Sequence, residues 1–257
     1  MSNDSILKTF LVTFLLCVVC SVLVCMAALV RIDREAYNQL LETRSTVLAA
    51  GGYDDQLAAG ASAEELFANF EMKIINLDTG EIATEFNPEE FNPKAIMDNP
   101  DTVVAIPAAF DIANIKQRPK FVRIFVDNSK GQIVVPVSGP GMWGPMAAYI
   151  GVKNDGTTVN GLKFYQHSET PGLGSEIERP KFQNQWIGKK LYGNSGNLAI
   201  KVVKNGRFDP NGADAAHTID GLAGATVTGD KVQAMVQYWF SDHGYGKFLT
   251  KYTKSKE

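Results

Sequence analysis

The sequence predicts an α+β protein, with a single N-terminal transmembrane helix followed by one soluble domain that has an antiparallel sheet and flanking helices. Three features indicate this fold class. The N-terminal part contains a long uncharged segment, the second half contains strand-like segments joined by hairpin turns, and the C-terminal part contains an amphipathic helix. About 200 residues follow the membrane-proximal part, which is enough to enclose a hydrophobic core.

The segment from Phe10 to Val30 carries no charge and lies between Lys8 and Arg31. About 20 apolar residues span the hydrocarbon core of a bilayer as a helix, so this segment is expected to cross a membrane. A cleaved signal peptide is the alternative, because Cys25-Met26-Ala27 resembles a cleavage site. The apolar core of a signal peptide is usually only about 7 to 15 residues long, which favours the membrane helix.

All three cysteines, Cys17, Cys20 and Cys25, lie inside this apolar segment, so the rest of the chain has neither a disulfide nor a thiol. The spacing of Cys17 and Cys20 is that of a redox or metal pair. In a lone apolar helix we interpret both as small packing residues. Positive charges on both sides of the segment leave its orientation in the membrane open.

Arg34 to Ala50 has apolar residues at helical spacing and is followed by Gly51-Gly52, which is typical of a helix end. We expect this stretch to continue the membrane helix as a stalk. The expected divisions of the chain are a tail at 1–9, a membrane helix at 10–30, a stalk at 31–52 and an α+β domain at 53–257.

The first part of the domain is predicted to contain a short helix and a hairpin. Ser62-Ala63-Glu64-Glu65 is a capping box that opens a helix to about Phe70. Met72 to Asn76 and Glu81 to Thr84 then flank the turn Asp78-Thr79-Gly80. Residues 86–100 are rich in Asn and Pro, and we expect them to be irregular.

From Phe121 onward the pattern predicts an antiparallel sheet. Apolar or alternating segments are joined by turn sequences such as Asn128-Ser129-Lys130-Gly131 and Asn154-Asp155-Gly156. The predicted strands are 121–126, 133–137, 147–152 and 162–165, followed by a helix from Ser175 to Trp186 and a strand from Leu198 to Val203.

An amphipathic helix is predicted from Gly229 to about His243, with Thr228 as its N-cap. Thr226 would then lie at the positive end of the helix dipole, among the small residues Gly224 and Ala225. A phosphate group is stable at such a position. A plain glycine turn with threonine caps is the alternative interpretation of this segment.

A second motif precedes it, the loop Glu169-Thr170-Pro171-Gly172-Leu173-Gly174. Proline fixes one backbone dihedral, whereas the glycines permit left-handed conformations and close approach of the backbone to a flat ring. Taken alone, such a loop is more often a plain turn between a strand and a helix, here the helix expected at Ser175. The turn Gly139-Pro140-Gly141-Met142-Trp143 adds an aromatic side chain.

Together these segments resemble the FMN-binding domain shared by the C subunit of the sodium-translocating NADH:quinone oxidoreductase (Nqr) and the G subunit of its Rnf relatives. In that family the last threonine of a Ser/Thr-Gly-Ala-Thr core carries FMN through a phosphoester bond. The matching core here is Ala223-Gly224-Ala225-Thr226, flanked by Asp220 and Thr228. Ala223 departs from the usual Ser or Thr. Length favours Nqr over Rnf, and the resemblance is weakest at about residues 50–119.

The resemblance implies one covalent FMN on Thr226 and no catalytic residue in the chain itself. Thr226 lacks an obvious base, and a hydroxyl is a weak nucleophile without one, so a separate flavin transferase is expected to attach the cofactor. The remaining candidate cofactor-binding residues are expected to contact either the phosphate or the flavin ring. They are Gly224, Ala225, Thr228 and Lys204 for the phosphate side, and Trp143, Glu169, Thr170, Gly172, Leu173 and Gly174 for the ring side.

The same resemblance implies partners and location. Electrons that began at NADH would reach this FMN through iron-sulfur centres of the complex and pass to the FMN of the B subunit, on the way to ubiquinone. The B, D, E and F subunits are the expected partners. The domain would lie on the periplasmic side of the bacterial inner membrane. The apolar segment holds no group to line a sodium path, so sodium is expected to cross elsewhere.

Other classes of function are disfavoured by the sequence. The three histidines are far apart with no other metal ligand at suitable spacing, so no metal site is expected. A net charge of −3 with scattered basic residues argues against nucleic-acid binding. An Rnf-type G subunit, a membrane-tethered assembly protein without a chromophore, and a reversible binder of a phosphorylated ligand remain as alternatives.

Overall fold

The computed structural model describes residues 6–254, and within them the side chains of all residues except 29–37 and 39. Residues 1–5 of the expected tail and several side chains of the expected stalk therefore lie outside the described residues. The chain divides into two compact units, Met1–Arg44 and Ser45–Glu257. The mixed α+β class with an antiparallel sheet, predicted from the sequence, is confirmed.

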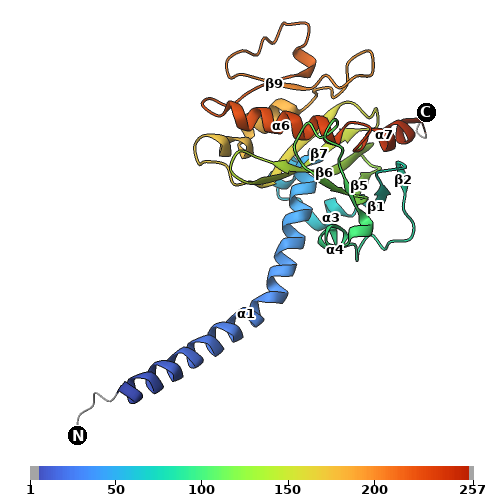
Figure 1. Ribbon diagram of the computed structural model, residues 1–257. Helices are drawn as coiled ribbons and strands as arrows, with labels where there is room; N and C mark the ends of the chain where they lie inside the picture. The colour runs from blue at the N-terminus through green and yellow to red at the C-terminus, as the bar shows by residue number, and fades with distance from the viewer. Residues whose placement is uncertain (1–5, 255–257) are drawn as a thin grey trace. The chain divides into compact units, whose positions relative to one another are not determined.

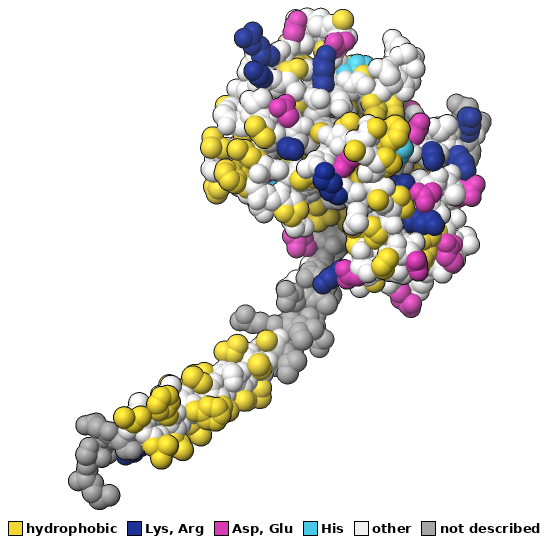
Figure 2. All heavy atoms as spheres, in the orientation of Figure 1, with side chains coloured by type: hydrophobic (Ala, Val, Ile, Leu, Met, Phe, Trp, Pro, Cys, Tyr) yellow, Lys and Arg dark blue, Asp and Glu magenta, His cyan; other side chains and the backbone are white. Residues whose placement is uncertain are grey.

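Helix α1 spans Ile6–Ala50. Its first part, Ile6–Ala28, is long and apolar enough to cross a membrane, and none of it is buried within the protein. Figure 2 shows this part of the helix covered by hydrophobic side chains. Among the described residues no other helix has this length and composition. The sequence prediction of one N-terminal membrane helix agrees with this finding.

The centre of the second unit is a six-stranded antiparallel sheet in the order β2-β1-β5-β6-β7-β8 (Figure 1). The predicted hairpin turns join β5 to β6 and β7 to β8, and each contains a glycine with positive φ, Gly131 at 63° and Gly156 at 68°. The strands are β1 (Phe70–Asn76), β2 (Glu81–Ile82), β5 (Phe121–Asp127), β6 (Gln132–Pro140), β7 (Pro145–Lys153) and β8 (Val159–Gln166).

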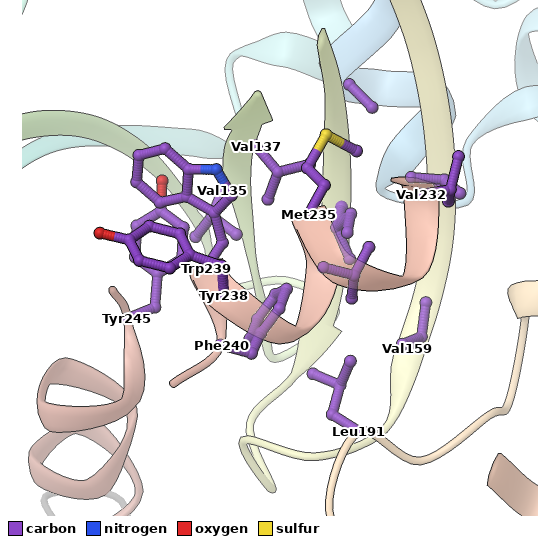
Figure 3. Close-up of a cluster of buried hydrophobic side chains, with 14 of the residues drawn as sticks. Val135, Val137, Val159, Leu191, Val232, Met235, Tyr238, Trp239, Phe240 and Tyr245 are labelled. Atoms are coloured by element: carbon purple, nitrogen blue, oxygen red, sulfur yellow. The ribbon is translucent and has the colours of Figure 1, made fainter. Parts of the chain in front are cut away.

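One face of the sheet packs against helix α6 (Thr226–Trp239). Val232, Met235 and Val236 follow one another at helical spacing and are fully buried in the same hydrophobic core as Val135 and Val137 of β6. Figure 3 shows side chains of this core between helix and sheet. Helix α7 (Gly246–Lys254) follows α6 as a separate helix.

The opposite face of the sheet is covered by the last turn of α1, where Val47 and Leu48 pack with Phe125 and Val134. The glycine carbonyl that follows this helix is bonded by side chains from the sheet: Gly51 O accepts from Gln132 Nε2 at 2.8 Å and from Asn160 Nδ2 at 3.0 Å. Two short helices, α2 (Asp54–Ala58) and α3 (Ala63–Phe67), follow on. Ser62 caps α3 as predicted.

Strands β5 and β6 pair over only three residues, from Phe125↔Val134 to Asp127↔Gln132. Beyond the Phe125↔Val134 pair the two strands diverge: β5 stays paired with β1, and β6 stays paired with β7. Trp239 Nε1 donates to Ser138 O at 2.6 Å, and the Tyr245 hydroxyl donates to Pro136 O at 2.5 Å. These two side chains thus satisfy carbonyl groups of β6 on the side where β5 no longer pairs.

The structure corrects three local predictions. The helix predicted from Ser175 to Trp186 is broken into η2 (Gly174–Glu178), α5 (Pro180–Gln183) and η3 (Asn184–Trp186), because proline excludes its preceding residue from the helical region. Residues 86–100 are not wholly irregular, since Asn92 caps helix α4 (Pro93–Asp98). The strand expected at Leu198–Val203 is only β9 (Lys201–Val203).

The remaining elements are short. Strand β9 pairs in parallel with β10 (Thr218–Asp220), a strand that the sequence did not predict. β3 (Val103–Ala105) pairs with β4 (Gln117–Pro119). Two single turns of 3-10 helix, η1 (Pro100–Thr102) and η4 (Ala215–His217), complete the described elements.

Candidate functional site

Thr226 is the first residue of α6, and its side chain is exposed. The preceding residue, Ala225, is the N-cap and offers no side-chain hydrogen bond to the helix. Gly224 reaches this turn with a φ of 71°, a conformation that glycine adopts without steric cost. The first-turn N–H groups of α6 therefore have no side-chain cap, and they lie at the same helix end as the Thr226 hydroxyl.

Thr228 is not the N-cap that the sequence predicted. Helix α6 begins earlier than expected, so Thr228 lies within its first turn and is 1% exposed. Its Oγ1 donates a 2.6 Å hydrogen bond to Oε2 of Glu169. The N-cap position is taken by Ala225, and the Thr228 hydroxyl is directed to Glu169 instead.

Glu169 is buried and links three segments of the site. Its Oε1 accepts from the backbone N–H of Met142 at 2.7 Å and of Trp143 at 3.4 Å, while Oε2 is bonded to Thr228. Both carboxylate oxygens are thus used within the protein. Glu169 holds the loop that carries Trp143 against the first turn of α6, and its oxygens are not exposed as a polar edge for a ligand.

Two glycines permit this arrangement. A Cβ at Gly141 would lie 2.3 Å from Oε1 of Glu169, and a Cβ at Gly174 would lie 2.6 Å from its Oε2. Any larger residue would displace the carboxylate. The sequence prediction gave Gly174 a role beside a flat ring, but in the structure it packs against Glu169 and Thr228.

The rest of the loop is open to solvent. Gly172 has a φ of 74° and no atom within 4 Å of its would-be Cβ, so the space beside it is free within the described chain. The exposed Thr170 closes the turn through its carbonyl, which accepts from Leu173 N at 3.1 Å and from Ser175 N at 3.2 Å. Leu173 Cδ2 lies 3.2 Å from the would-be Cβ of Gly224, so the two motifs touch.

Large apolar side chains surround the Glu169–Thr228 hydrogen bond. Trp143 is 66% exposed and Leu173 is 45% exposed, although the backbone of each residue is held by hydrogen bonds. Met142 and Val227 beside them are exposed as well. Exposed apolar groups gathered around one site mark a surface that binds a ligand or a partner.

Lys204 and Thr226 line the same narrow cleft, together with Asn205 and Asp230. Asp220 fixes the turn that follows Lys204, because its Oδ1 accepts from Gly206 N at 2.8 Å. Lys204 is exposed and adds a positive charge to the helix end, while Asp230 adds a carboxylate that the sequence analysis missed. Asp230 follows Thr226 by one helical turn, a spacing from which its position could have been predicted.

The structure therefore brings the predicted residues together in two groups around Thr226. Lys204 and the uncapped end of α6 form a positively polarised cleft that suits a phosphate. Trp143 and Leu173 are exposed and the space beside Gly172 is free, on the two loops joined by Glu169, and this side suits a planar ring. Glu169, Gly174 and Thr228 lie beneath these exposed residues and support them.

Comparison with known proteins gives a consistent match. Residues 141–241 match the FMN-binding domain family model. The chain is 35% identical over 259 residues to the C subunit of the Na(+)-translocating NADH-quinone reductase of Pseudomonas aeruginosa, with 99% of each chain covered. It is 38% identical to the corresponding C subunit of Yersinia pestis, with 97% of this chain and 94% of the relative covered.

Solved structures match as well. The crystal structure of Shewanella oneidensis NqrC superposes with a TM-score of 0.74 at 30% identity, covering 83% of this chain and 97% of that one. The C subunit of the Na(+)-translocating NADH-quinone reductase of Parabacteroides distasonis gives a TM-score of 0.60 at 28% identity, covering 84% and 96%. The residues that match the family model include β7, β8, α6 and both motifs of the candidate site.

Proposed function

The chain belongs to the family of C subunits of the Na(+)-translocating NADH-quinone reductases, and we propose that it carries FMN covalently on Thr226. It is a membrane-anchored electron-transfer subunit with an FMN-binding domain, and the other subunits of the complex are its partners. The exposed Thr226 hydroxyl at the uncapped end of α6 is the observation that carries the proposal.

The phosphate site fits the residues that are present. An ester on the Thr226 side chain places the remaining phosphate charge beside the first-turn N–H groups of α6, where the helix dipole stabilises an anion. Lys204 in the same cleft adds a second favourable charge. Asp230, which also lines that cleft, limits its net positive charge.

Among the described residues no side chain forms a hydrogen bond with the Thr226 hydroxyl, so no base is positioned on it in this structure. A threonine hydroxyl needs such activation to attack a phosphoryl group. A separate flavin transferase therefore attaches the FMN during maturation. Thr226 is modified once and has no part in electron transfer afterwards.

The bound FMN supplies the electron-transfer chemistry, and the protein supplies position and surroundings. Trp143 and Leu173 form apolar walls beside the ring, and the positive-φ turn at Gly172 leaves the edge of the ring uncovered. Glu169 keeps the Trp143 loop in place through the Met142 and Trp143 N–H groups. This partial exposure allows the ring to meet redox centres of neighbouring subunits.

In the complex, the chain lies between centres that are reduced by NADH and the FMN of the B subunit, with the D, E and F subunits as further neighbours. Its domain lies on the periplasmic side of the inner membrane. The covalent bond keeps the flavin at high local concentration even where the protein covers it poorly. The chain passes electrons and provides no path for sodium.

The test of the attachment site uses the full-length chain co-expressed with its flavin transferase. After denaturation, the wild-type chain and Thr226→Ser should keep a fluorescent cofactor and gain the mass of FMN less one water. Thr226→Ala should show neither signal. Thr250→Ala, an exposed threonine of α7, is the matched control and should load normally. Covalent FMN on the Thr226→Ala chain would overturn the assignment.

The periplasmic location is tested separately with Asn211→Cys, an exposed loop position. In intact cells a membrane-impermeant maleimide should label this variant. The wild-type chain, whose only cysteines are Cys17, Cys20 and Cys25 in α1, gives the background. Labelling that requires permeabilised cells would place the domain in the cytoplasm.

A further inference from the structure

A cavity of about 240 Å³ opens where β5 and β6 diverge. Its walls are mostly aromatic and apolar, and they come from both strands, from β7 and β8, and from segments around α4 and β4. Trp239 and Tyr245, whose rings lie next to each other in Figure 3, also line it. The residues that matter for its chemistry are Arg123, Tyr149 and Tyr165.

The cavity is separate from the FMN site. Trp239 in its wall is the last residue of α6, whereas Thr226 is the first, and the helix has 14 residues. At about 1.5 Å per residue this separates the two sites by about 20 Å. None of the residues proposed to contact FMN lines the cavity.

Arg123 on β5 is a partly buried cation whose bonds go to neutral groups. Its Nη1 donates to the backbone carbonyls of Pro88 at 3.1 Å and of Phe91 at 3.5 Å. No carboxylate in the described part of the chain forms an ion pair with it. Burial lowers the pKa of Arg123, and this effect outweighs the opposing influence of Tyr149.

Two phenol groups line the same cavity. Tyr149 and Tyr165 lie with ring centroids 5.1 Å apart, and within the described residues neither hydroxyl has a hydrogen-bond partner. Tyr245 in the same wall differs, because its hydroxyl donates to Pro136 O. Burial raises the pKa of both Tyr149 and Tyr165, so they are neutral donors at pH 7.

The segment beside the cavity is held in a strained conformation. Asn114 and Lys116 have φ values of 59° and 74°, although neither is glycine. The carboxylate of Asp111 fixes this segment by accepting from Ile115 N at 2.7 Å and from Lys116 N at 2.9 Å. Such strain persists only where surrounding contacts enforce it, and here it places Ile115 and Gln117 in the cavity wall.

We propose that this cavity binds a small carboxylate ligand whose apolar part has the size of two fused rings. The carboxylate group forms an ion pair with the Arg123 guanidinium. Its oxygen atoms also accept hydrogen bonds from the Tyr149 and Tyr165 hydroxyls. Arginine is the side chain best suited to a carboxylate, because its fork of N–H groups matches the two oxygens. Benzene fills an apolar cavity of about 150 Å³, so about 240 Å³ suits a body of naphthalene size.

The test compares 1-naphthoate with its neutral isostere 1-naphthamide, titrated by calorimetry into the full-length, FMN-loaded chain in zwitterionic lipid nanodiscs at pH 7.5. The carboxylate should bind at least tenfold more tightly than the amide. Equal binding of the two probes, or no binding of either at millimolar concentration, would overturn the proposal.

Variants locate the binding. Arg123→Gln should abolish the preference for the carboxylate, while Arg207→Gln, an exposed arginine outside the cavity, should preserve it. Tyr165→Phe, at the exposed rim, should weaken naphthoate by roughly threefold to tenfold because one hydrogen bond is lost. An unchanged preference in Arg123→Gln would refute the role of that guanidinium.

Arg123→Gln also removes the hydrogen bonds to Pro88 O and Phe91 O and could loosen that loop, so a further variant tests the cavity without touching them. Met97, an exposed residue of the cavity wall, takes no part in those hydrogen bonds. Met97→Trp should reduce the binding of both probes together and leave covalent FMN unchanged. Full naphthoate binding by Met97→Trp would place the ligand elsewhere.

Discussion

The Thr228 hydroxyl donates a buried 2.6 Å hydrogen bond to the Glu169 carboxylate, across 59 residues of sequence. This hydrogen bond joins the loop motif to the threonine motif beneath the contact between Leu173 and Gly224. Because Glu169 also accepts from the N–H groups of Met142 and Trp143, it fixes the geometry between the exposed Trp143 and the first turn of α6. We therefore expect the distance between an attached phosphate and a stacked ring to depend on a residue that touches neither.

Thr228→Val keeps the shape of the side chain and removes the donor to a buried carboxylate. We expect a loss of about 1.5–3 kcal/mol in the free energy of unfolding, measured by urea denaturation of the full-length chain in detergent. In chains produced without the flavin transferase, so that neither carries FMN, Thr226→Val, at an exposed position of the same helical turn, should change it by less than about 0.5 kcal/mol. Equal losses in the two variants would contradict a structural role for the hydrogen bond.

Thr228→Val and Thr228→Ser together separate the structural role of the hydroxyl from cofactor loading. Thr228→Ser keeps the hydroxyl, so it should have most of the wild-type stability and the normal flavin spectrum. Thr228→Val should still accept covalent FMN on Thr226, with an altered flavin spectrum because the Trp143 loop is no longer held firmly. A Thr228→Val chain without covalent FMN would indicate that Thr228 serves the phosphate or the transferase directly.

Gly172 and Gly174 should respond differently to alanine. Gly174→Ala places a Cβ 2.6 Å from Glu169 Oε2, so it should destabilise the chain by about 1–3 kcal/mol through overpacking and disturb the flavin spectrum. Gly172→Ala meets no neighbouring atom and should cost only the strain of its positive φ, about 1–2 kcal/mol, without disturbing Glu169. Thermal unfolding and flavin absorbance measure both effects. Equal losses of stability and equal flavin spectra in the two variants would contradict a clash between the added Cβ at position 174 and Glu169.

Asp127 should contribute a pH-dependent part of the stability. Burial disfavours its charge, but hydrogen bonds from Gln132, Ser129 and Tyr53 outweigh burial and lower the pKa of Asp127 below its usual value. A carboxyl group with a lowered folded-state pKa stabilises the protein above about pH 4, its unfolded pKa, and this stabilisation is lost as the pH falls through the folded pKa.

Asp127→Asn should therefore be less stable than the wild type at pH 7 and should lose less stability than the wild type on acidification below about pH 4. Urea midpoints measured at several pH values check this. Asp101→Asn, an exposed carboxylate of η1, is the control and should follow the wild-type curve. An Asp127→Asn profile parallel to the wild type would refute the coupling.

Gly151 should be required where the sheet receives the last turn of α1. A Cβ at this position would lie 2.2 Å from Ala50 O, a backbone atom that cannot rotate away. Gly151→Ala should lower the free energy of unfolding by about 1–3 kcal/mol or more. Gly193→Ala should be tolerated, because its Cβ would lie 3.2 Å from the nearest atom, Asn197 Oδ1. A comparable loss of stability in Gly193→Ala would contradict the role of the clash at Gly151.

Local patterns in the sequence predicted the features that depend on near neighbours in the chain. The apolar run of α1, the turns containing Gly131 and Gly156, and the cap at Ser62 all follow from residues a few positions apart. The position of Thr226 near the start of a helix was predicted for the same reason. The helix predicted from Ser175 to Trp186 is interrupted before Pro180, because proline keeps Arg179 in an extended conformation.

The sequence by itself determined the membrane helix, the antiparallel sheet and the two motifs around Thr226, because periodicity and turn chemistry act over short distances. Only the tertiary structure decided that Thr228 faces Glu169, that Lys204 shares a cleft with Thr226, and that β5 and β6 diverge beside Arg123. The predicted helix began at Gly229 and so left Thr228 outside it, whereas α6 begins at Thr226 and Thr228, one turn before Val232, lies on the buried face of the helix. Contacts between distant segments depend on how whole elements pack, and packing is determined by the complete core rather than by any local pattern.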